Sequence, residues 1–356
     1  MLARFPRHSV RSAWSMPEVS TASNPRYSEQ ALKEKAMLQE LNKKPRLQRT
    51  LGYLKLSGPG FMNAAFTLGA GSFASSVTLG AAYGYSMMWV PLYSFTFGIF
   101  FLALAARFVC QSETPTIEAQ NRYHGKFFGT FATGLLAGCI ASMTATIGVM
   151  DWLLFNNGMI ARGFSEDHER LGRFDAFCGG LLPVTLVLSL VSIAFAEAFS
   201  GKPGIPTTSS ELCEALMGVI PSVWIQAGFY LGVLAMVLSS MIGLSATCAT
   251  SFYQSLNIPR DTKAWYHPLV VLAPQIGCLG VFFGKPVTIV VTVAAMQSLF
   301  NWISGNSWYL LGNDPRYLGK KVIQSRFFNF GILVGISILN IVFITFVMGK
   351  MGVWPE

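Results

Sequence analysis

The pair of side chains in this sequence best suited to bind a metal ion is an acidic residue beside a thioether. Asp151 follows Met150 at the end of a long apolar run, and four apolar residues follow it. A carboxylate inside a membrane is costly and marks a functional site by default, and a carboxylate with a thioether suits a borderline transition metal. The alternative, which the residues alone favour, is that Asp151 ends a helix at the membrane interface, just before Asn156–Asn157–Gly158.

A second candidate site lies in the apolar run 58–80, which is rich in glycine and hydroxyl side chains and poor in leucine. Glycine propagates a helix poorly, so we expect a break near residues 68–72. Unwound backbone at membrane depth needs partners from protein or a water-filled cavity, and broken helices carry substrate in many secondary transporters. The alternative is a tightly packed face of small residues. If the helix breaks, the expected ligands are the carbonyl groups of Leu68, Gly69 and Gly71 and the hydroxyl group of Ser72.

The remaining reactive side chains do not form a recognisable site. The 4 histidines include no pair at metal-ligand spacing, and we expect His168, which lies in the charged stretch SEDHER, to be solvated. The 6 cysteines are widely spaced and predict neither a disulfide framework nor a zinc site. The sequence contains no catalytic triad, P-loop or dinucleotide fingerprint, so neither an enzyme nor a cofactor is expected.

The composition places these residues in a membrane protein. Of 356 residues, 52% are hydrophobic and 12% are charged, whereas soluble domains carry about 25% charged residues. About eight apolar runs are each close to the roughly 20 residues that a membrane-spanning helix needs. We therefore predict an all-α, polytopic membrane helix bundle. The runs are 58–80, 86–109, 127–150, 176–198, 222–247, 266–284, 286–311 and 327–349.

The first 56 residues form a basic tail, with eleven Lys and Arg residues against four Glu residues. Residues 28–50 have helical composition, and Leu32, Met37 and Leu41 give this predicted helix a weak apolar side. Next to a membrane domain, a basic tail indicates a cytoplasmic N-terminus in contact with anionic lipid, and it does not indicate nucleic-acid binding. The predicted organisation is this tail (1–56), a transmembrane domain (57–350) and a short C-terminal tail (351–356).

The later loops conflict with the positive-inside rule. With a cytoplasmic tail and eight full spans, the loop after the second run lies inside, in agreement with its basic residues. The basic residues that would then lie outside are Arg162, Arg170, Arg173, Arg260, Lys263, Arg316, Lys320, Lys321 and Arg326, whereas only Lys202, Lys285 and Lys350 would lie inside. Either one run does not span the membrane, or the chain departs from the architecture of its relatives.

Several segments, in the right order, resemble transporters of the Nramp family of divalent-metal transporters. The segment 58–107 resembles the first two spans, with Gly58–Pro59–Gly60 at its start and Ala105–Ala106–Arg107 at its end. The segment 228–259 resembles the eighth span, and LLGNDPRYLGKK resembles the link between the last two spans. RGFSEDHERLGRFDAFCGGLLP resembles the link from the sixth span to the seventh in a divergent Nramp-like branch.

The resemblance implies a LeuT-like inverted repeat of about eleven spans, of which this chain lacks about three and therefore has an incomplete repeat. Such a loss of an odd number of spans inverts the later loops and accounts for the charge conflict. The family binds metal through an Asp-Pro-Gly-Asn motif in the first span and a Met-Pro-His motif in the sixth. Here the first motif reads Gly69–Ala70–Gly71–Ser72, and the region nearest the second reads 147–152, which includes Met150 and Asp151.

We therefore expect a multi-pass protein of a plasma or inner membrane that transports a divalent metal ion of the manganese or iron type by alternating access, with most of the family's ligands replaced. Two alternatives remain open. Loss of the ligand Asp and Met favours transport of another small solute, whereas the missing spans and inverted charge favour a shortened membrane protein that no longer transports.

Overall fold

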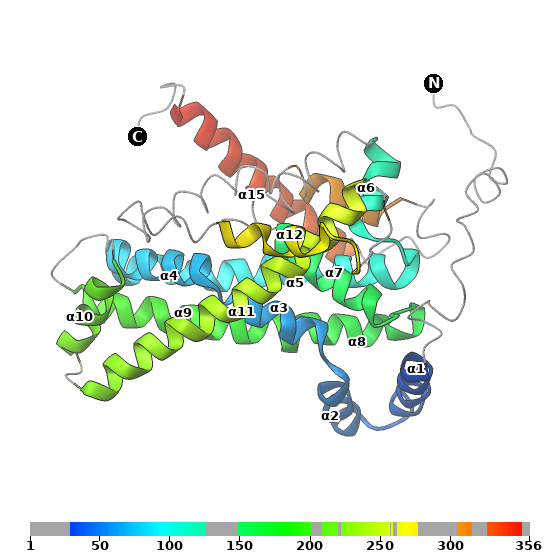
Figure 1. The fold of residues 1–356 in the computed structure, drawn as a ribbon, viewed down its shortest axis with the longest axis horizontal. Coiled ribbons are helices and arrows are strands. Elements are labelled where there is room, and N and C mark those ends of the chain that lie inside the picture. The colour runs from blue at the N-terminus through cyan, green and yellow to red at the C-terminus, as the bar shows by residue number, and fades with distance from the viewer. Residues whose placement is uncertain are drawn as a thin grey trace.

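The computed structural model describes residues 29–125, 149–200, 208–219, 222–256, 258, 262–276, 303, 305–314 and 326–350. All regular secondary structure in these ranges is helical, which confirms the all-α prediction (Figure 1). Among these described residues, four segments are long and apolar enough to cross a membrane: Trp89–Ser112, Glu166–Ala198, Val223–Leu256 and Arg326–Thr345. The chain is therefore an integral membrane helix bundle. The predicted spans within 127–148 and 277–302 lie outside the described residues.

The four long segments agree with four of the predicted runs. They contain α5 (Trp89–Ser112), the π-helical turn η7 (Asp175–Leu181) followed by α9 (Leu182–Ala198), α11 (Val223–Leu256) and α15 (Arg326–Lys350). Their outer faces are apolar and exposed, as for Trp224 (81% exposed) and Ile242 (74%) on α11. Such faces suit contact with lipid. The segment Glu166–Ala198 also contains α8 (Glu169–Phe174). Shorter helices include α6 (Thr116–His124), α7 (Val149–Ala161), α10 (Ser209–Val219) and α12 (His267–Leu272).

The first apolar run forms two helices, as the glycine-rich sequence predicts. The run divides into α3 (Pro59–Thr67) and α4 (Ala70–Tyr83), which are separated by Leu68 and Gly69. Gly71 and Ser72, which the sequence also placed in the break, instead form the first turn of α4. Only Leu68 and Gly69 leave the helical conformation, and the backbone of Gly71 and Ser72 is helical.

The basic segment before α3 differs from its prediction. The single helix expected over 28–50 is two helices, α1 (Glu29–Leu41) and α2 (Arg46–Leu56). Pro45 precedes α2 with φ −59° and ψ 156°, because proline cannot continue the preceding helix but fits just before the first turn of a new one. Of the predicted apolar side, Leu41 packs against the hydrophobic core, whereas Leu32 and Met37 are exposed. The buried residues of α1 also include Ala31 and Leu38, which the prediction did not name.

α4 and α9 form the closest helix pair near the break. A Cβ atom on Gly80 would lie 2.2 Å from the backbone oxygen of Ser192, so only glycine permits this approach. The Ser192 hydroxyl donates to the carbonyl of Ser76 at 3.1 Å, and Val77 and Phe195 are buried between the helices. This packing holds α4 firmly against α9.

Replacement of Gly80 tests this packing. In Gly80→Ala the new methyl group forces α4 and α9 apart, and we expect a loss of about 1–3 kcal/mol of stability. The measurement is the thermal unfolding temperature of the detergent-solubilised protein. Gly232→Ala on α11 is the control, because a Cβ there meets nothing within 4 Å. An unfolding temperature for Gly80→Ala at or above the wild-type value would contradict the close approach.

Candidate functional site

The break between α3 and α4 is a single extended step of the backbone. Leu68 has φ −72° and ψ 30°, and Gly69 has φ −83° and ψ −177°. A side chain at Gly69 is excluded by α11, because a Cβ atom would lie 2.2 Å from Ser240 Oγ. Glycine is thus required here for close approach to a neighbouring helix and not for a left-handed conformation.

Three serine hydroxyl groups bond the carbonyl groups around the break. From α11, Ser239 Oγ donates to Ala65 O at 3.1 Å and Ser240 Oγ donates to Phe66 O at 3.5 Å. From α4, Ser72 Oγ makes a short hydrogen bond with Thr67 O and lies 3.0 Å from Gly69 O. These bonds supply the partners that the interrupted helix cannot provide in an apolar environment.

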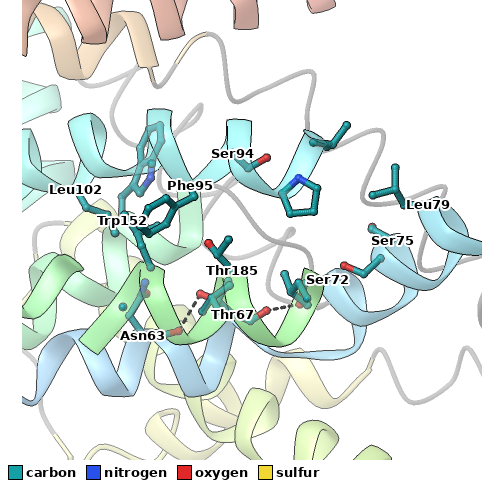
Figure 2. Close-up of a pocket in the computed structure, with 18 residues that line it drawn as sticks. Asn63, Thr67, Ser72, Ser75, Leu79, Ser94, Phe95, Leu102, Trp152 and Thr185 are labelled. Carbon is teal, nitrogen blue, oxygen red and sulfur yellow. Dashed lines mark hydrogen bonds between the residues drawn. The ribbon is translucent and has the colours of Figure 1, made fainter. Parts of the chain in front are cut away.

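A cavity of about 530 Å³ lies beside the break, bordered by α3, α4, α5, α7, η7 and α9 (Figure 2). Its wall combines apolar side chains such as Trp152, Phe95 and Leu102 with neutral polar ones. Among the described residues that line it, none carries a charge. The polar lining residues are Asn63, Thr67, Ser72, Ser75, Ser76, Ser94 and Thr185.

Asn63 provides an oxygen atom that is available to a ligand. The residue is 4% exposed and lies on α3, and its Oδ1 atom has no hydrogen-bond partner within the described part of the chain. Thr67 Oγ1 donates to the Asn63 backbone carbonyl at 2.8 Å, so both residues lie on the same side of α3 (Figure 2). A buried amide oxygen without a donor costs about 1–3 kcal/mol. Sequence reasoning missed Asn63, because one amide in an apolar run does not show which way it points.

The helix that carries the second predicted site, α7, borders this cavity through one described residue, Trp152. Met150 and Asp151 lie in the first turn of α7, and the next residue, Trp152, lines the cavity and stacks on Phe101 with ring centroids 5.1 Å apart. The side chains of Met150 and Asp151 are outside the described part of the structure. The helix continues past Asp151 and residues 156–158 to Ala161, so Asp151 does not end it just before residues 156–158, as the alternative interpretation of the sequence had it.

Of the predicted break residues, only Ser72 lines the cavity. Leu68 ends α3, Gly69 forms the extended step beside α11, and Gly71 lies in α4. No group of three or more His, Cys, Asp and Glu side chains that could hold a metal ion occurs among the residues described. The helices that carry the two predicted sites are neighbours, since α3 and α7 pack together and both border one cavity.

The other end of α3 is held by a buried carboxylate that sequence reasoning also missed. Asp175, in η7, is fully buried, and its Oδ2 atom accepts a hydrogen bond from the Gly60 N–H at 2.6 Å. A Cβ atom on Gly60 would lie 2.1 Å from the Asp175 carbonyl oxygen. Gly60 is therefore required because η7 contacts its backbone. The signal in the sequence was a single Asp within an apolar stretch, paired with glycines more than 100 residues away.

The prediction that His168 is solvated is wrong. The side chain is 2% exposed and stacks on Phe164 with ring centroids 4.9 Å apart. Its Nδ1 atom accepts a hydrogen bond from the Ser165 N–H at 3.3 Å. The charged stretch that contains it is covered by α1, through the ion pair of Lys35 with Asp167 at 2.7 Å, and this tertiary contact removes the histidine from water.

Solved structures of one transporter share this architecture. A mutant form of a manganese transporter from Eremococcus coleocola matches with a TM-score of 0.67 and 12% identity, over 88% of this chain and 90% of that chain. The fold is Nramp-like. The same transporter in complex with an aromatic bis-isothiourea substituted compound gives a TM-score of 0.62 at 12% identity, over 88% and 90% of the two chains. A second mutant gives 0.61 at 12% identity, over 86% and 89%.

The sequence itself matches no known protein-family model and no curated protein. At 12% identity the likeness establishes the Nramp-like fold and does not establish a ligand set. The resemblance of the sequence to Nramp transporters is thus confirmed at the level of the fold.

Ser72→Ala tests the hydrogen bonding at the break. The substitution removes the hydroxyl group that bonds Thr67 O and Gly69 O, and we expect a loss of about 1 kcal/mol of stability. Thermal unfolding in detergent is the measurement. Ser75→Ala is the control, since its hydroxyl group bonds the Gly71 carbonyl within α4 at 2.9 Å. Equal unfolding temperatures for the two variants would show that Ser72 does not stabilise the break.

Proposed function

We propose that the chain transports a divalent metal cation across a membrane by alternating access, with the cargo bound in the cavity beside the break between α3 and α4. The observation that carries this proposal is an interrupted helix that borders a cavity with apolar and neutral polar lining residues, in a fold shared with a manganese transporter. Broken helices at the centre of a bundle are where secondary transporters bind their substrates.

The cation ligands would be oxygen atoms. Asn63 Oδ1 has no donor among the described residues, and Thr67 and Ser72 contribute hydroxyl groups to the same cavity. Carbonyl groups at the break can accept a cation beside their serine donors, because a carbonyl oxygen has two lone pairs. Oxygen atoms of these types suit hard cations and, with a carboxylate, manganese.

The negative charge in this proposal comes from Asp151. The described lining of the cavity is neutral, and a desolvated divalent cation is costly to bury without an opposite charge. Asp151 lies on α7 directly before Trp152, which lines the cavity. This carboxylate would replace the one that the Nramp resemblance places at Gly69.

The orientation is proposed from charge. The basic tail lies on the cytoplasmic side of a plasma or inner membrane, where Lys and Arg accumulate. With the N-terminus inside, α3 crosses the cytoplasmic half and α4 the outer half. Residues of α4 from Ser72 to Leu79 line the cavity, so the cavity would lie mainly in the outer half of the membrane.

A second candidate is transport of a small neutral polar solute. A volume of about 530 Å³ falls within the range of about 300–1,000 Å³ for small-molecule sites. Hydroxyl and amide groups without charge are suited to a neutral solute such as a polyol. The specific observation in favour is the uncharged lining.

Uptake of radiolabelled manganese into proteoliposomes tests the primary proposal. We expect saturable uptake by the wild type and a loss of at least tenfold in Asp151→Asn, because the amide removes the negative charge and keeps the shape. Asp167→Asn is the matched control, since Asp167 is an exposed carboxylate away from the cavity, and its uptake should stay within twofold of wild type. Equal uptake by the two variants would contradict a role for Asp151, and no uptake by folded wild-type protein would exclude manganese as cargo.

Ligand-induced stabilisation separates the two candidates. A ligand that binds the native state at 100 times its Kd stabilises it by about 2.7 kcal/mol. We expect manganese to raise the thermal unfolding temperature of the wild type and not of Asn63→Leu, whereas polyols and small amides leave both unchanged. Stabilisation by a neutral solute, lost in Asn63→Leu and without any effect of manganese, would favour the second candidate.

A further inference from the structure

The helices α1 and α2 form a hairpin at the edge of the bundle, below α3 and α8 in Figure 1. Only Ser57 and Gly58 separate the end of α2 from Pro59, the first residue of α3. Because α3 belongs to an apolar run at membrane depth, so short a link keeps α2 at the membrane surface.

Specific contacts fix the hairpin to the bundle. Arg162 follows α7 and donates to Glu34 Oε1 on α1 and to the Leu56 carbonyl at the end of α2, both at 2.9 Å. Lys35 pairs with Asp167, and this hydrogen bond raises the pKa of Lys35 above its ordinary value. The Tyr53 ring packs edge-on against Phe174, with centroids 5.5 Å apart. The hairpin is thus a defined platform.

One side of α2 is an exposed leucine stripe, formed by Leu47, Leu51 and Leu54. These side chains are 75%, 54% and 42% exposed, respectively. Their spacing of four and three residues places them on one helix face. An exposed apolar stripe on a helix at the membrane surface lies against the boundary between headgroups and acyl chains.

The charge around this stripe is positive. The acidic residues of the hairpin, Glu29, Glu34 and Glu40, are all in ion pairs, with Lys33, Arg162 and Lys44 respectively. Lys35 of the hairpin pairs with Asp167. The hairpin has four other basic residues, and no ion pair within the described ranges involves them. They are Lys43, Arg46, Arg49 and Lys55, of which all but Arg49 are exposed.

A groove of about 490 Å³ runs between α1 and α2. Its polar lining consists of two lysines, one glutamate and one amide (Lys44, Lys55, Glu40 and Gln48), so one positive charge is left after Lys44 pairs with Glu40 at 2.9 Å. Its apolar lining includes Met37 and Leu51. Leu51 also belongs to the leucine stripe, so the groove is continuous with the surface that meets acyl chains. The two helices approach closely because Gly52 has no side chain; a Cβ there would lie 2.4 Å from Leu41 Cδ2.

We propose that this groove binds the headgroup of an anionic phospholipid, with the acyl chains along the leucine stripe. The phosphate would lie beside Lys55, which has no ion pair among the described residues, and would share the ammonium group of Lys44 with Glu40. The basic side chains select negative charge, and the leucine stripe selects a lipid over a soluble anion. This binding does not depend on which solute the cavity carries. The lipid would hold α2, and through the two-residue link it would position the start of α3.

Native mass spectrometry of the full-length protein in detergent tests the proposal. The probes are phosphatidylglycerol and phosphatidylcholine with the same acyl chains. We expect wild-type protein to prefer phosphatidylglycerol and the double variant Lys44→Gln/Lys55→Gln to bind it about 25-fold more weakly, from roughly fivefold for each basic side chain near an anionic surface. The charge-matched control Lys33→Gln/Lys263→Gln changes two exposed lysines outside the groove and should stay within twofold of wild type.

A third variant tests the role of the leucine stripe. Leu47→Ser/Leu54→Ser keeps the charges and should lose at least fivefold in affinity for phosphatidylglycerol. Thermal unfolding of each variant within 2 °C of wild type confirms that it is folded, as expected for exposed positions. Equal binding of the two lipids by wild type, or wild-type affinity in the groove variant, would overturn the proposal. Soluble glycerol phosphate that binds as tightly as the lipid would also overturn it, because the stripe would then contribute nothing.

Discussion

The structure depends on how the carbonyl groups of Ala65, Phe66 and Thr67, freed by the break at Leu68 and Gly69, are satisfied. A backbone polar group in an apolar environment needs a partner, and a broken helix loses its own. Here Ser239 and Ser240 of α11 and Ser72 of α4 provide the hydroxyl groups. This requirement places α11 against the break, and Gly69 is the residue that allows the contact. The cavity lies on the other side of the interrupted helix, so the break both fixes a neighbour and exposes polar groups to a ligand.

The two halves of the first apolar run are held by different contacts. α4 packs on α9 through Gly80, where two backbones touch and no side chain intervenes. α3 is held at each end by polar contacts, from Asp175 to Gly60 and from the serines of α11. At Gly60 the backbone of α3 also closely approaches that of η7, so hydrogen bonds and close packing together hold this half.

The sequence predicted the features that depend on local composition. Long apolar runs predicted the membrane helices, and the glycines near residue 69 predicted the break. It failed where distant segments decide the outcome. His168 is buried because α1 covers it, and Asp175 binds a backbone group 115 positions away. Asn63 showed no periodicity that would reveal its direction. Pro45 was a local signal that could have been used, since proline ends the preceding helix.

The absence of the aspartate that the Nramp resemblance places at Gly69 and the close approach of α11 to Gly69 go together. The Nramp resemblance places an aspartate at Gly69, but any side chain there would meet Ser240 Oγ at 2.2 Å and Phe66 O at 3.0 Å. An aspartate would displace the Ser240 side chain, and the hydrogen bond from Ser240 Oγ to Phe66 O would then be lost. Ser240 of α11 therefore occupies space that such a carboxylate needs. In the proposed transport of a cation the negative charge would come instead from Asp151 on α7, which precedes the cavity-lining Trp152.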